Sequence, residues 1–196
     1  MQYEFVGSWA QDPHLSSAML GSLRDLNHRF LDLVAARGDW GAGYVAPLTE
    51  TQRAAAAGCP YALFDLRFQD EVHWRLRLRH FESWRVADES PGDDATVSFV
   101  RLALFYAWHV ASGTGMKAQL LLGMSTDTAA AFRALTVNQL PGLAATETVH
   151  LSARWNGCSA YWSALSAAAS RADAPRLRRV QLSGLQLAAA ARLPEF

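Results

Sequence analysis

The sequence predicts an all-α fold, a compact multi-helix domain of roughly eight to ten helices with a helix-turn-helix-like C-terminal core. Two observations lead to this prediction. Apolar residues recur at helical spacing along most of the chain, and residue types that cap helices precede many of these stretches. Hydrophobic residues make up 51% of the 196 residues, which is enough to fill a sizeable core.

The first long helix is predicted to begin at Asp12 and Pro13, which are typical of a helix start, and to end at Arg37 and Gly38. Its apolar residues recur with the helical period and form one stripe. The stripe consists of Leu15, Met19, Leu23, Leu26, Phe30, Leu33 and Val34.

Two shorter helices are predicted next. The segment 49–52 (TETQ) is a capping box, which indicates a short helix that ends at Gly58. We expect Cys59 and Pro60 to begin another helix, because the residues that follow as far as Phe68 are largely apolar and therefore buried.

Residues 71–84 are predicted as a helix capped by Asp70, although residues 74–80 (WRLRLRH) alternate between apolar and basic types as a strand does. We favour the helix, since the flanking residues have a helical pattern and a lone strand has no evident pairing partner. The arginines of this stretch are expected on a solvated face; they are Arg75, Arg77 and Arg79.

The polar stretch 88–94 (DESPGDD) is the best candidate for a boundary. It divides residues 1–90, an N-terminal helical region, from residues 91–196, a second helical region. We expect the two regions to form one compact unit.

The second region begins with a strongly apolar helix from Val97 to Val110, which the segment 112–115 (SGTG) interrupts. We expect His109, inside this helix, to be a hydrogen-bonded core histidine. Two more helices are predicted near the end of the chain, over residues 159–170 and from Pro175 onward.

Residues 118–155 have the spacing of a helix-turn-helix. One helix ends in a glycine turn, after which Ser125 can cap a helix over residues 126–135. Thr136 can cap the next helix, over residues 137–145. This segment is the most informative part of the chain.

The middle helix of this segment offers little to read DNA bases. Its predicted packing residues are Thr128, Ala129 and Phe132, and its exposed face consists of Thr126, Asp127, Ala130 and Arg133. Arginine, lysine, asparagine and glutamine are the usual base readers, so a face with one cation argues against direct readout. The candidate DNA or partner contacts are Ser125, Thr126, Thr128, Arg133, Asn138, Gln139, Arg176, Arg178 and Arg179.

A longer pattern runs through residues 118–155 without a gap. It consists of Leu122-Gly123-Met124, Ala129, Ala134-Leu135-Thr136, Gln139, Leu143-Ala144, Thr146 and Arg154-Trp155. With these residues the segment, about a fifth of the chain, resembles the core of the D subunit of the bacterial flagellar master transcriptional regulator. The resemblance implies an all-helical, dimer-forming protein that acts on transcription. In that family a separate zinc-bearing C subunit supplies much of the DNA recognition, and the D subunit is much shorter than this chain.

The sequence nominates no catalytic, cofactor or metal site. His73 and His80 would share a helix face, but Arg77 lies between them, and a cation between two ligands argues against a metal. Cys59 is expected to be buried, whereas Cys158 could be exposed. The fingerprints of nucleotide-binding loops and of a serine nucleophile are absent from the chain.

Charge and hydropathy favour a protein that works through other proteins. Eighteen basic residues balance eighteen acidic ones, so no overall field attracts nucleic acid. The chain has neither a membrane span nor a signal-peptide pattern, which indicates the cytoplasm. We therefore expect a cytoplasmic transcriptional-regulator-like protein that binds a protein partner, forms a homodimer and contacts DNA indirectly. A dimeric interaction module that never contacts DNA and a helical small-ligand-binding protein are the alternatives.

Overall fold

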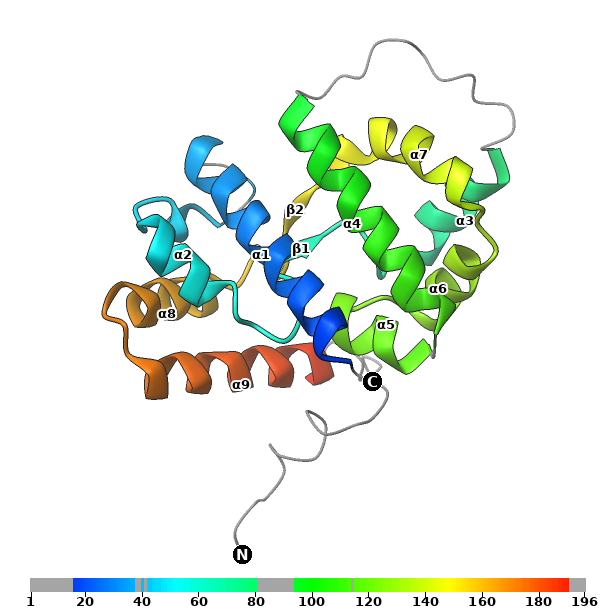
Figure 1. The fold of residues 1–196 in the computed structure, drawn as a ribbon. Coiled ribbons are helices and arrows are strands. Elements are labelled where there is room, and N and C mark those ends of the chain that lie inside the picture. The colour runs from blue at the N-terminus through cyan, green and yellow to red at the C-terminus, as the bar shows by residue number, and fades with distance from the viewer. Residues whose placement is uncertain (1–15, 38–39, 41, 81–93, 114, 191–196) are drawn as a thin grey trace, which may run out of the picture.

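A computed structural model describes residues 16–37, 40, 42–80, 94–113 and 115–190. In these ranges the chain is all-α, as predicted, apart from one pair of two-residue strands (Figure 1). The helices are α1 (Ser17–Arg37), α2 (Glu50–Ala56), α3 (Glu71–His80), α4 (Asp94–Ser112), α5 (Gly115–Leu122), α6 (Thr126–Arg133), α7 (Leu140–Glu147), α8 (Ser159–Ser170) and α9 (Ala174–Ala190). Short 3₁₀ turns are η1 (Gly43–Val45), η3 (Val137–Gln139) and η4 (Thr148–His150). The strands are β1 (Phe64–Asp65) and β2 (Ser152–Ala153), which pair antiparallel with Phe64 opposite Ala153.

Helix α4 is the central element of the fold. It packs against α1, α5, α6 and α7, and α3 packs against α6 (Figure 1). Helix α8 packs against both α2 and α9, so the last helices of the chain lie beside its first part. These contacts join α1, α2 and α3 to the helices from α4 to α9, and one cluster of buried residues extends from α1 to α9.

Most helices lie where the sequence predicts them, because local signals set their ends. The capping box of α2 is present, with Gln52 Oε1 accepting from the Thr49 N–H at 2.9 Å. Residues 74–80 are helical, and Asp70 Oδ1 caps α3 by accepting from the His73 N–H at 2.8 Å. The predicted helix start at residues 12–13, the boundary at 88–94 and residues 81–84 lie outside the described residues.

The predicted helix from Cys59 to Phe68 is wrong, because these residues form bends, a turn and β1 in place of a helix. The buried side chain of Asn27 in α1 takes the place of helical hydrogen bonds. Its Nδ2 donates to Tyr61 O at 2.9 Å and lies 3.3 Å from both Ala57 O and Cys59 O. Its Oδ1 accepts from the Leu63 N–H at 2.8 Å. Backbone groups of every second residue from Ala57 to Leu63 thus face the side chain of Asn27.

Residues 57–66, here called the central segment, are also bonded to the second half of the chain. The Ala62 N–H donates to Leu121 O at 2.7 Å, and the Arg154 N–H donates to Leu63 O at 2.9 Å. The side chains from Tyr61 to Phe64 are completely buried. The central segment therefore obtains its hydrogen bonds from α1, α5 and the β2 region together.

Replacing Asn27 with alanine should lower the free energy of unfolding by roughly 3 kcal/mol, because it leaves buried carbonyls and one buried N–H without a partner. Asn138→Ala is the matched control, since Asn138 is exposed and should change stability by less than about 0.5 kcal/mol. Urea denaturation followed by circular dichroism measures both. Equal midpoints for the two variants would contradict the role given to Asn27.

Candidate functional site

Residues 118–155, which have the spacing of a helix-turn-helix, form consecutive short helices. Helix α5 ends at Leu122, and the next residue, Gly123, has φ +73°. The Gly123 N–H donates to Gln119 O at 2.9 Å, which is the bond of an αL cap. Ser125 then caps α6, with its hydroxyl oxygen accepting from the Thr128 N–H at 3.1 Å. The helix predicted after Thr136 begins as the 3₁₀ turn η3 and continues as α7.

The structure divides the candidate contacts of this segment by exposure. Thr126, Arg133 and Asn138 are exposed, and Ser125 and Gln139 are half-buried. Thr128 is buried, with 1% of its surface exposed, so its side chain is not available as a contact. It packs inward together with Ala129 and Phe132, as the sequence also predicted.

The three arginines near the C-terminus lie apart from the other candidates. Arg178 and Arg179 are exposed and Arg176 is half-buried, all in the first turns of α9. This end of α9 lies below α8 and α2 in Figure 1, on the other side of the fold from α6. The structure therefore does not join this basic cluster to the exposed face of α6.

Gly123 and Arg154 are in direct contact. Arg154 is buried, its Nη1 donates to Leu121 O at 3.3 Å, and its guanidinium lies 4.6 Å from the centre of the Trp155 ring. A Cβ on Gly123 would lie 2.5 Å from Arg154 Nη2. Glycine at position 123 thus permits both the left-handed turn and the close approach of the Arg154 guanidinium to the backbone.

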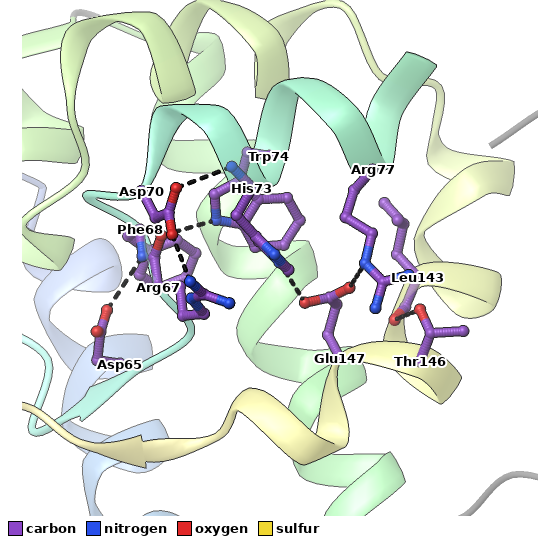
Figure 2. A network of polar contacts seen from close by, with 10 residues as sticks. All are labelled: Asp65, Arg67, Phe68, Asp70, His73, Trp74, Arg77, Leu143, Thr146 and Glu147. Carbon is purple, nitrogen blue, oxygen red and sulfur yellow. Dashed lines mark hydrogen bonds and ion pairs between the residues drawn. The ribbon is translucent and has the colours of Figure 1, made fainter. Parts of the chain in front are cut away.

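A buried carboxylate forms a second polar centre, between α3 and α7 (Figure 2). Glu147, the last residue of α7, is completely buried, and its Oε2 lies 2.8 Å from His73 Nε2. Arg77 Nε lies 2.8 Å from Oε1 as an ion pair. Because an isolated buried charge is costly, these two partners from α3 stabilise the carboxylate. Arg77 was expected on a solvated face, but its side chain is half-buried and forms this ion pair.

His150 completes this centre. Its ring lies edge-on to that of His73, with centroids 4.7 Å apart, and donor atoms of His73, Glu147 and His150 all lie within 4.8 Å of one another. Burial lowers the pKa of His150, and Glu147 opposes this shift. The imidazole is therefore neutral near pH 7 and keeps a free lone pair. These three residues could hold a metal ion.

Sequence reasoning missed this cluster. A readable signal was present, because Glu147 and His150 are three residues apart and such a pair shares a face of one helical turn. The third donor, His73, comes from a distant part of the chain, and only the packing of α3 places it there.

Other predicted histidine and cysteine environments differ in part. His109 is exposed on α4, so the expectation of a core histidine is wrong. His28 lies 3.8 Å from Asp32, one turn further along α1. Cys59 is buried, as expected, and burial raises the pKa of its thiol from 9.0 to about 11. Cys158 is half-buried at the start of α8.

No family model, curated protein or solved structure matches this chain. In the part of the chain that the structure describes, no helix is both long and apolar enough to cross a membrane.

Gly123→Ala should lower the free energy of unfolding by at least about 2 kcal/mol, because alanine disfavours a positive φ and its Cβ would overlap the arginine. Gly21→Ala is the matched control: a Cβ there, on the surface of α1, meets nothing within 4 Å. The control should raise stability by roughly 0.5–1 kcal/mol, since alanine favours helices. Urea titration measures both changes, and shifts of the same sign would contradict the assigned role of Gly123.

Single-thiol variants should show that Cys59 is the inert cysteine. In Cys158→Ser, which leaves only Cys59, alkylation by iodoacetamide at pH 8 should be at least about tenfold slower than in Cys59→Ser, because the thiolate is the reactive form. The rates, read by mass spectrometry, should become equal in urea. Equal rates in the folded proteins would contradict the raised pKa and the burial of Cys59.

Proposed function

We propose that this chain is a cytoplasmic transcriptional-regulator-like protein that acts mainly through a protein partner. The observation that carries the proposal is the exposed face of α6, where Arg133 is the one cation and Asp127 is an anion. A recognition helix needs several donors near its start to read bases and phosphates. The resemblance of residues 118–155 to a regulator subunit that works with a separate partner supports the same proposal.

The groove between α3 and α6 is the surface that suits such a partner. Its lining includes Arg75, Leu78 and Arg79 of α3 together with Asp127, Ala131 and Ala134 at α6. Apolar residues with charged residues around them are typical of protein interfaces. Val72 and Leu76, exposed at 55% and 49%, are further apolar residues on the surface of α3. A homodimer and indirect contact with DNA through the partner belong to this proposal.

Chromatin immunoprecipitation with the tagged full-length chain in its native host tests the proposal. We expect enrichment at discrete promoters that is lost in Ala131→Glu, which fills the groove with a charged side chain. Ser163→Glu, on the exposed side of α8, is the matched control and should keep the enrichment. The purified chain alone should show little retention on DNA.

Two results would contradict the proposal. Salt-sensitive binding of the purified chain to DNA that requires Arg133 would make the chain a direct reader, because phosphate contacts weaken steeply with salt. Absence of promoter enrichment, together with a stable homodimer in light scattering, would favour the dimeric module that never contacts DNA.

A further inference from the structure

We propose that His73, Glu147 and His150 bind a divalent transition-metal ion of the Zn²⁺ or Co²⁺ class. Two imidazole nitrogens and one carboxylate oxygen are a donor set that such ions prefer, with water as a further ligand. The three donor atoms already lie within 4.8 Å of one another. The inference is independent of the proposed function, since it rests on this cluster alone.

The Glu147 carboxylate is oriented so that one oxygen can bind a metal ion. The side chain is completely buried, and Oε1 receives no aligned hydrogen bond from the described residues, although Arg77 Nε lies 2.8 Å away. The ion pair with Arg77 orients Oε1 toward the guanidinium, so Oε2 points toward His73 (Figure 2). Partners of this kind fix the orientation of a ligating carboxylate in metal sites.

The position of His150 is the second, independent observation. Its ring packs against that of His73, but no hydrogen bond to its nitrogens is present within the described residues. Neither nitrogen of His150 is buried without a partner, so the ring is open to solvent and to an approaching ion. The half-buried ring also leaves room for a water ligand on its exposed side.

Metal binding requires the donor atoms to move by about an ångström. His73 Nε2 and Glu147 Oε2 are 2.8 Å apart and share a proton. An ion takes the place of that proton, which moves to Nδ1 or, when Nδ1 already carries one, to solvent, and His73 then coordinates as a neutral imidazole. Zinc bonds of about 2.1 Å at a tetrahedral angle place donors about 3.4 Å apart. These two atoms would therefore separate by roughly 0.6 Å. Donor atoms that are now as much as 4.8 Å apart would approach by at most about 1.4 Å. The bound ion would tie α3 to the end of α7 and to η4.

The test uses the full-length chain after treatment with a chelator and dialysis. Titration with Zn²⁺ in a calorimeter should show one site per chain, and Co²⁺ should give the visible absorption of a low-symmetry site. His150→Gln should weaken Zn²⁺ binding at least tenfold, whereas His109→Gln, at an exposed histidine of α4, should leave it unchanged. Zn²⁺ should raise Tm in the parent protein and in His109→Gln, and much less in His150→Gln.

His73→Gln is a second ligand variant, but it also removes the partner of a buried carboxylate and can fail to fold. His150→Gln keeps the test valid, because that side chain is half-buried and makes no hydrogen bond to any residue that the structure describes. Zn²⁺ binding that is equal in the parent protein and in His150→Gln would overturn the proposal. Absence of saturable binding of either ion to the parent protein would also overturn it, and the cluster would then be an ion-pair network only.

Discussion

The fold depends on how the buried backbone of the central segment, residues 57–66, is hydrogen-bonded. A helix satisfies its own N–H and C=O groups, but a non-helical segment inside a core must find partners elsewhere. Here Asn27 of α1 binds one side of the segment, and Leu121 O and the Arg154 N–H bind further groups. Because these partners come from both halves of the chain, neither half can satisfy the segment alone. We infer that the two halves unfold together.

Packing around Tyr61 extends this dependence to the C-terminal helices. The Tyr61 hydroxyl donates to Gln181 O in α9 at 3.1 Å and lies 3.1 Å from the Tyr161 hydroxyl in α8. A Cβ on Gly184 would overlap that same hydroxyl, so the glycine allows α9 to lie close to the central segment. The arrangement of α8 and α9 beside α2 thus follows from the central segment as well.

The sequence was sufficient for elements whose signals are local. Thr49 and Ser125 each cap the next helix by accepting a hydrogen bond from the backbone N–H three residues later. The inward face of α6 follows from helical spacing. The central segment could not be predicted in the same way, because a continuous apolar run has no period that separates a buried strand from a buried helix. The residue that decides between them, Asn27, is more than thirty positions earlier in the chain.

The candidate sites show the same division. The low number of cations on the exposed face of α6 could be predicted, because exposure along one helix follows from its period. The inclusion of Thr128 among the candidate contacts was wrong, because its side chain is buried. In the sequence, Arg77 argued against a metal because it lies between His73 and His80 on one face of a helix. Packing against α7 changes that argument, because Arg77 binds one oxygen of Glu147 and His73 faces the other.

Helix α3 links the two surfaces on which the functional arguments rest. One side of it lines the groove with α6 through Arg75 and Arg79, and another side binds Glu147 through His73 and Arg77. The carboxylate is completely buried and must be neutralised in the folded state, whether by its two partners alone or with a metal ion. In both cases the contacts of Glu147 with His73 and Arg77 hold α3 against the end of α7. Because α3 also lines the groove with α6, the position of that side of the groove depends on the Glu147 carboxylate.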